Sequence, residues 1–143
     1  MLENILCATD GSKSSEKAVD FAIKLAQRES AKLTFVTVSL IASEASAKSY
    51  FWDSDVMRAG DEQIDKELSS AEAKAKNAGL SNFSSVTVYG KNIAAALIDF
   101  AESSGHDHIV TGSIGRTGVS RLLLGSIAYE VVSKAHCPVT IVR

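Results

Sequence analysis

Residues 108–132 read HIVTGSIGRTGVSRLLLGSIAYEVV and place a glycine loop between a predicted strand and a predicted helix. The first four residues form a short run rich in β-branched side chains, and apolar residues recur at helical spacing after Ser126. Glycine lets the backbone approach a ligand closely, and the unpaired N–H groups of a helix start attract anions. The stretch therefore predicts a phosphate-binding loop and a helix that starts at Gly125 and Ser126, where Ser126 can cap the helix in the free protein. The alternative is a glycine-rich connection that binds nothing.

Short apolar runs alternate with segments of helical period along the chain, which is the pattern of βαβ units packed on a parallel sheet. With 143 residues the chain has the length of one domain. We therefore predict a single α/β domain over residues 1–143, with an open five-stranded parallel sheet and helices on both faces. Strands are expected at about 4–9, 33–40, 83–89, 108–111 and 138–142. Helices are expected after Ser14 as an N-cap, at about 55–78, at 93–103 and after Ser126.

The composition argues against several classes of protein. Fifteen basic and seventeen acidic residues give a net charge of −2, without a basic block that would neutralise a nucleic-acid backbone. The first residues lead into a strand without the layout of a signal peptide, and no apolar run reaches membrane-spanning length. Cys7 and Cys137 lie in apolar contexts without the spacing of metal ligands, which favours buried thiols. We therefore expect a cytoplasmic protein without membrane insertion or nucleic-acid binding.

The sequence contains no arrangement typical of a catalytic site. The Gly-x-Ser-x-Gly turn of serine hydrolases is absent, and Asp10-Gly-Ser-Lys-Ser stands where a P-loop or a dinucleotide-binding turn would follow the first strand. His106 and His108 flank Asp107 at the predicted strand end opposite the glycine loop, without a third ligand. This favours a solvated strand entry over a metal site. No catalytic residue is assigned, and the metal ligands stay unknown.

The spacing Gly112-x2-Gly115-x9-Gly125-Ser126 resembles the nucleotide-binding signature of the universal stress protein family, in its ATP-binding branch. The resemblance extends to residues 5–12, 33–38 and 135–143, and so covers nearly the whole chain. Two departures lie outside the signature. Gly90 is followed by Lys-Asn-Ile where the family often has a proline, and residues 40–55 match nothing fixed.

This resemblance implies the strand order 3-2-1-4-5, which brings the carboxyl ends of the first and fourth strands together at a ligand-binding crevice. It implies ATP with Mg²⁺ or Mn²⁺ as the ligand. The implied phosphate-binding residues are Gly112, Gly115, Gly125 and Ser126, and Arg116 can add positive charge. Asp10 matches the aspartate on the ribose side and Val38 the residue that borders adenine. An Asx turn before Gly11 is the ordinary role of such an aspartate, and both roles can coexist.

The function expected from these features is nucleotide-dependent regulation in a stress response. The alternatives are a nucleotide-free dimeric interaction protein and a slow ATP hydrolase. The resemblance implies a homodimer through the last strand, Val139-Thr-Ile-Val-Arg143, and the protein partner is unknown. Residues 40–55 carry Tyr50-Phe51-Trp52 and form either a lid or partner surface, or a loop whose rings fold onto the core.

Overall fold

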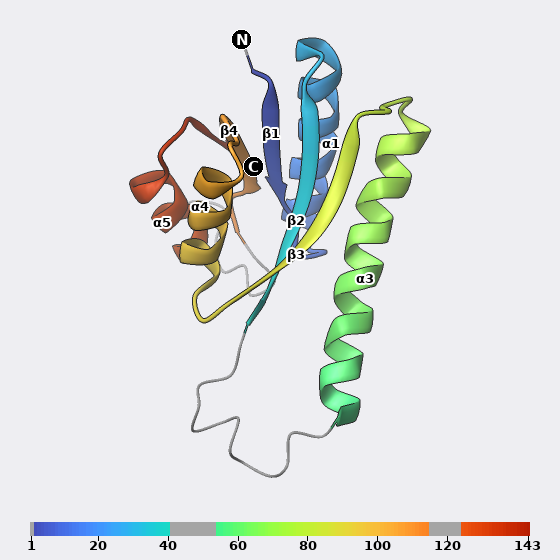
Figure 1. Ribbon diagram of the computed structural model, residues 1–143, viewed down its shortest axis with the longest axis vertical. Helices are drawn as coiled ribbons and strands as arrows, with labels where there is room; N and C mark the ends of the chain where they lie inside the picture. The colour runs from blue at the N-terminus through green and yellow to red at the C-terminus, as the bar shows by residue number, and fades with distance from the viewer. Residues whose placement is uncertain (1, 41–53, 115–123) are drawn as a thin grey trace.

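The computed structural model describes the backbone of residues 2–40, 54–114 and 124–143, and the side chains of all of these except 54–61. The proposed phosphate-site residues Gly115 and Arg116 lie outside the described residues, as do the aromatic residues Tyr50, Phe51 and Trp52. Figure 1 shows the arrangement of the helices and strands. The strands are β1 (Asn4–Ala8), β2 (Lys32–Leu40), β3 (Phe83–Gly90), β4 (His108–Gly112) and β5 (Val139–Val142). The helices are α1 (Lys13–Glu29), α3 (Ser54–Asn77), α4 (Ile93–Ser103) and α5 (Ser126–Lys134).

The five strands form one parallel sheet in the order β3-β2-β1-β4-β5, which confirms the predicted fold class and strand order. Helices α1 and α3 cover one face of this sheet, and α4 and α5 cover the other (Figure 1). The predicted element boundaries agree with the observed ones to within one or two residues. The agreement arises because the apolar period changes at each boundary from that of a strand to that of a helix.

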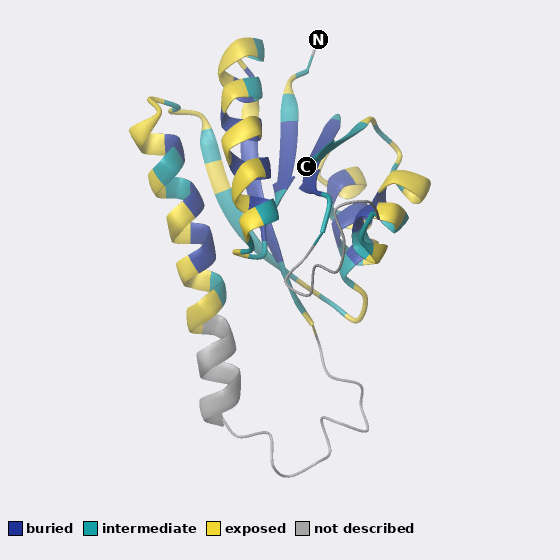
Figure 2. Cartoon of the chain, turned by 180° about the vertical axis from the view of Figure 1, so that it is seen from behind, coloured by how far each residue is buried: buried dark blue, intermediate teal, exposed yellow. Residues whose placement is uncertain are grey.

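Successive residues of the central strands serve the two faces in turn. Ile5 and Cys7 of β1 pack toward α1 and α3, whereas Leu6 between them packs toward α4 and α5. All three side chains are fully buried. Strands covered on both faces read as continuous apolar runs, since each residue meets a helix layer on its own side. Figure 2 shows this distribution, with buried residues on the strands and exposed residues on the outer sides of the helices.

The prediction of a solvated entry to β4 is wrong, because His106 is 4% and His108 9% exposed. The ring of His106 lies against Phe100 of α4, with the two ring centroids 5.5 Å apart. The Nε2 atom of His108 lies 2.7 Å from Thr140 Oγ1. The sequence pattern missed this burial because the side chains of Phe100 and Thr140 meet the two histidines only when α4 and β5 pack beside β4 in the folded chain.

The stability of the fold should fall as the pH drops below about 6.5, the ordinary pKa of histidine. Burial lowers the pKa of His106; the Ala101 carbonyl and Asp107 offset part of this effect, whereas Lys32 and His136 add to it. Burial also lowers the pKa of His108. The unfolded chain therefore takes up protons at a higher pH than the folded chain does, so acidification favours unfolding.

Urea unfolding at pH 7.5, 6.5 and 5.5 tests this expectation. As the pH is lowered from 7.5 to 5.5, the free energy of unfolding should decrease in the wild type. It should decrease less in His106→Leu, whose side chain cannot take up a proton. The comparison variant is His136→Gln, which removes an exposed histidine whose Nε2 lies 3.0 Å from the His106 carbonyl oxygen and which adds to the lowering of the His106 pKa, so it should reduce the pH dependence less than His106→Leu does. An equal pH dependence in His106→Leu and the wild type would contradict this assignment.

Candidate functional site

The candidate site lies where β1 and β4 end side by side at the centre of the sheet. The chain leaves β1 toward α1 on one face, whereas β4 leads by way of residues 113–125 to α5 on the other face (Figure 1). Such a divergence opens a crevice beyond the carboxyl ends of parallel strands. The structure therefore brings together the Asp10 turn and both described ends of the glycine loop.

The turn after β1 is held by a network of hydrogen bonds between residues 9–15. The Ser12 N–H donates to Asp10 Oδ1 over 2.9 Å, so the Asx turn expected as the ordinary role of Asp10 is present. Gly11 has a φ of +78°, a conformation that suits glycine. Ser15 Oγ accepts the Asp10 N–H over 3.3 Å and lies 3.2 Å from Thr9 Oγ1. These hydrogen bonds thus fix the backbone of the turn.

Helix α1 begins earlier than the sequence predicted. Its N-cap is Ser12, whose Oγ accepts the Ser15 N–H over 3.2 Å. The prediction of Ser14 as the cap is therefore wrong. The reason is that the chain becomes helical immediately after the Asx turn, which leaves Ser14 in the first turn of the helix.

The two described ends of the glycine loop are tied together. The Ser113 N–H donates to the Val142 carbonyl over 3.0 Å, and the Ser113 carbonyl accepts the Gly125 N–H over 2.7 Å. The loop therefore leaves and re-enters the fold at one point, next to β5. The predicted ligands Gly112, Gly125 and Ser126 all lie at or beside this point.

The last residue of β4, Gly112, lies directly against the first turn of α1. A Cβ atom at Gly112 would overlap Ser14 Oγ and would lie 2.9 Å from both the carbonyl carbon and the carbonyl oxygen of Ser14. Real Cβ atoms do not approach backbone atoms so closely. The glycine of the signature at this position is therefore required by packing between α1 and β4.

Helix α5 begins without a side-chain cap. Its N-cap is Gly125, at φ −60° and ψ 155°, so the prediction that Ser126 caps the helix is wrong: Ser126 is already helical. By contrast, Ser12 caps α1 and Asn92 caps α4 with their side-chain oxygens. The first N–H groups of α5 carry the partial positive charge of a helix start. Because the cap residue is glycine, it offers no side chain that could accept a hydrogen bond from them. This arrangement suits an anion.

Val38 lies in the part of β2 that extends past the end of β1. Pairing between the two strands ends at Ala8 and Val36, two residues before Val38. The Val38 side chain is half-buried and packs on the face of the sheet that α4 and α5 cover. This position is on the α5 side of the crevice, beside the Asp10 turn, and offers an apolar surface.

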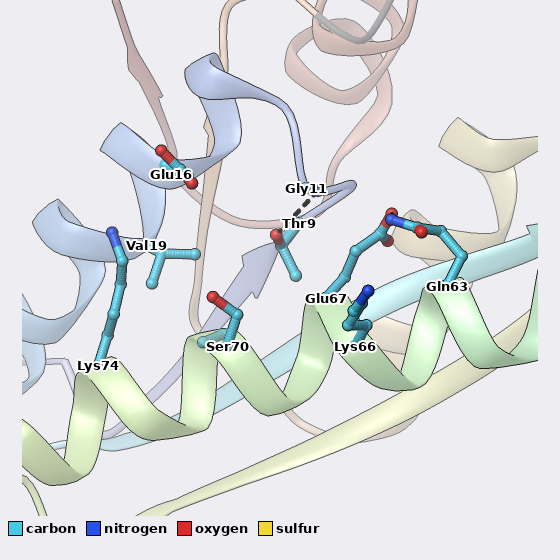
Figure 3. A pocket seen from close by; sticks show the side chains of 10 residues that line it. Thr9, Gly11, Glu16, Val19, Gln63, Lys66, Glu67, Ser70 and Lys74 are labelled. Atoms are coloured by element: carbon cyan, nitrogen blue, oxygen red, sulfur yellow. Dashed lines mark hydrogen bonds between the residues drawn. The ribbon is translucent and has the colours of Figure 1, made fainter.

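A hollow lies behind the Asp10 turn, between α1 and α3 (Figure 3). It has a volume of about 170 Å³, and Gly11, Glu67, Lys66 and Lys74 are among its lining residues. The Glu67 side chain is 6% exposed, and its Oε1 accepts the Gln63 Nε2–H over 3.2 Å. A Cβ atom on Gly11 would lie 2.8 Å from Glu67 Cγ, so this side chain supports the turn from behind. The hollow is on the α1 and α3 face, away from Gly125.

Sequence reasoning missed Ser14 and Glu67 as neighbours of the site. Glu67 stands beside Leu68 in a helix whose sequence is mostly polar, and no spacing marks it. The position of Ser14 before a segment of helical period indicates only a helix cap. Both residues lie near the site only because helices packed on the sheet bring them to the ends of β1 and β4.

Other chemistry at the site is limited among the described residues. They contain no group of three or more histidine, cysteine or acidic side chains placed to hold a metal ion. Burial raises the pKa of the Cys7 thiol far above its ordinary value, so this thiol is an unreactive part of the core. Cys137 is only half-buried.

None of the described helices is long and apolar enough to cross a bilayer.

The chain is similar over its whole length to universal stress proteins. The sequence model of the universal stress protein family matches residues 1–143. The universal stress protein YxiE of Bacillus subtilis is 32% identical over 152 residues, with all of both chains covered. A universal stress protein solved in complex with cAMP superimposes with a TM-score of 0.77 at 31% identity, covering 99% of this chain and 97% of the other. The Archaeoglobus fulgidus universal stress protein solved in complex with dAMP has a TM-score of 0.69 at 21% identity, and both chains are fully covered.

Proposed function

Because the chain belongs to the universal stress protein family, we propose that it binds an adenine nucleotide, ATP with Mg²⁺ or Mn²⁺, in the crevice between β1 and β4. The observation that carries the proposal is the start of α5, which lacks a side-chain cap at the end of the glycine signature. A relative at 31% identity was solved with cAMP, which supports a nucleotide of this class.

Each proposed ligand contributes by its own chemistry. The N–H groups that follow Gly125, with the Ser126 hydroxyl, would hold phosphate oxygens, and Gly115 and Arg116 would complete the phosphate site. On the ribose side, the Asp10 carboxylate would accept hydroxyl protons. Val38 would offer apolar surface to the adenine ring. Gly112 would contribute indirectly, since its missing side chain lets α1 lie against the start of the loop.

A divalent cation fits this site as a companion of the phosphates. Mg²⁺ is commonly held by one or two carboxylates, several waters and the phosphates of its ligand, so a single carboxylate such as that of Asp10 is sufficient. The cation would neutralise phosphate charge beside the aspartate.

Regulation is the proposed use of this binding. Nucleotide occupancy would order residues 112–126 and segment 40–55, and so bias the interaction with a protein partner in the cytoplasm. Slow hydrolysis of ATP is the less favoured alternative, since the Asp10 carboxylate already accepts the Ser12 N–H and no second candidate base lies among the described residues of the crevice.

Calorimetric titration of purified, nucleotide-free protein with ATP and MgCl₂ tests the proposal. We expect saturable binding with one ATP per chain and a dissociation constant between about 1 μM and 1 mM. Titration with GTP measures the preference for adenine, and limited proteolysis with and without ATP measures ordering of segment 40–55. If the purified protein binds no ATP after any bound nucleotide has been removed, a dimeric interaction protein that uses no nucleotide describes this chain better.

We also propose a homodimer through β5. This strand is an edge of the sheet, since it pairs with β4 and has no second neighbour among the described strands. An edge strand presents unpaired N–H and C=O groups to a second chain. Exposed apolar residues of α5 lie nearby in sequence, with Tyr129 at 63% and Val132 at 49% exposure. Light scattering after size exclusion should give the mass of a dimer at micromolar concentration, and a monomer there would contradict this interface.

A further inference from the structure

We propose that Ser14, a residue outside the glycine signature, is a positioning residue that holds the start of the glycine loop in place for the nucleotide phosphates. This inference rests on the nucleotide-binding function proposed above. Ser14 is assigned no contact with the nucleotide and acts through the backbone of residues 112–114.

The evidence is a contact between two segments that lie 100 residues apart in the chain. The Ile114 N–H donates a hydrogen bond to Ser14 Oγ over 3.4 Å. Two residues earlier, Gly112 lies against the same side chain and against the Ser14 carbonyl group. Ile114 lies two residues after the end of β4, so Ser14 holds the first residues of the loop.

The three serine hydroxyls at the start of α1 have separate partners. Ser12 Oγ accepts the Ser15 N–H and caps the helix. Ser15 Oγ accepts the Asp10 N–H and so holds the end of β1. Ser14 Oγ, by contrast, accepts the Ile114 N–H and reaches across to β4. Removal of the Ser14 hydroxyl should therefore disturb the glycine loop and leave the Asp10 turn intact.

The other end of the loop is held differently, which makes the contribution of Ser14 separable. The backbone N–H and carbonyl of Ser113 form hydrogen bonds with Val142 and Gly125, and these hydrogen bonds do not involve α1. A variant without the Ser14 hydroxyl keeps this closure and the backbone packing at Gly112. We therefore expect it to fold, with a loop start that is less well placed.

The test compares ATP with adenosine, which lacks the phosphates, as ligands of wild type and Ser14→Ala. In Ser14→Ala the dissociation constant for ATP should rise about 3- to 10-fold, the range expected from one hydrogen bond. The constant for adenosine should change by less than about 2-fold, because its ring and ribose lie on the Val38 and Asp10 side. Hydrogen exchange should show faster exchange of the Ile114 amide without nucleotide.

Asn92→Ala is the matched control for destabilisation alone. It removes the cap of α4, where Asn92 Oδ1 accepts the Ala95 N–H over 2.9 Å, and leaves the contacts of Ser14 unchanged. It should lower the melting temperature without changing the ratio of the ATP and adenosine dissociation constants. A merely structural role of Ser14 would make Ser14→Ala behave in the same way.

The outcomes separate this inference from the function on which it rests. A selective loss of ATP affinity together with faster exchange at Ile114 supports it. An unchanged ratio of the two dissociation constants in Ser14→Ala, with normal ATP binding by the wild type, overturns the positioning role alone. If the wild type binds no ATP, the proposed function fails and this inference fails with it.

Discussion

The substitution Gly125→Asp is expected to weaken ATP binding at least about 100-fold while the fold remains as stable as the wild type or gains roughly a few tenths of a kcal/mol. Gly125 is the N-cap of α5 and has an extended backbone that aspartate readily adopts. An aspartate there would accept the first N–H groups of the helix and stabilise its start. The same carboxylate would occupy the groups that the phosphates need and would repel them. At an effective dielectric constant of about 20, two charges about 4 Å apart repel by about 4 kcal/mol.

Calorimetry with ATP and thermal unfolding check the two halves of this prediction. Gly125→Asn is the informative comparison, since an asparagine caps the helix without a charge and should cause a smaller loss of ATP affinity. Asn92→Asp places the same charge at the start of α4 and should leave ATP binding unchanged. Wild-type affinity in Gly125→Asp would show that the phosphates do not bind at the start of α5.

The second large effect is expected for Gly112→Ala, which should lower the free energy of unfolding by about 2 to 3 kcal/mol. The added Cβ would lie 2.9 Å from the carbonyl carbon and oxygen of Ser14, so α1 and β4 would have to move apart. These elements meet at the centre of the sheet, where displacement also disturbs buried side chains such as Val110. The melting temperature should fall by roughly 10 °C.

Chemical denaturation checks this value, and Gly105→Ala is the matched control. Gly105 has a φ of +71°, but a Cβ atom there would meet no atom within 4 Å beyond its chain neighbours, so its substitution measures conformational strain without a steric overlap. We expect a cost of about 1 kcal/mol there. Adding Ser14→Ala to Gly112→Ala should recover only part of the loss, because the carbonyl group remains. Equal losses in Gly112→Ala and Gly105→Ala would refute the packing role of Gly112.

Sequence reasoning located the two loops of the candidate site but not how their residues act. The glycine spacing and the Asp10 turn follow strands whose apolar runs are recognisable locally, and the resemblance supplied the strand order. It did not show that packing against Ser14 requires glycine at position 112, or that Gly125 rather than Ser126 is the N-cap of α5. These features depend on the backbone angles and contacts of the folded chain.

The sequence by itself determined the succession of strands and helices, the parallel α/β class and the presence of the glycine signature. These properties are local, because the apolar period of a segment and its flanking glycines are set by neighbouring residues. Only the tertiary structure decided that His106 and His108 are buried, that Glu67 supports Gly11 and that Ser14 meets Ile114. Each of these contacts joins segments brought together by close packing around the sheet, and local periodicity carries no information about which atoms meet there.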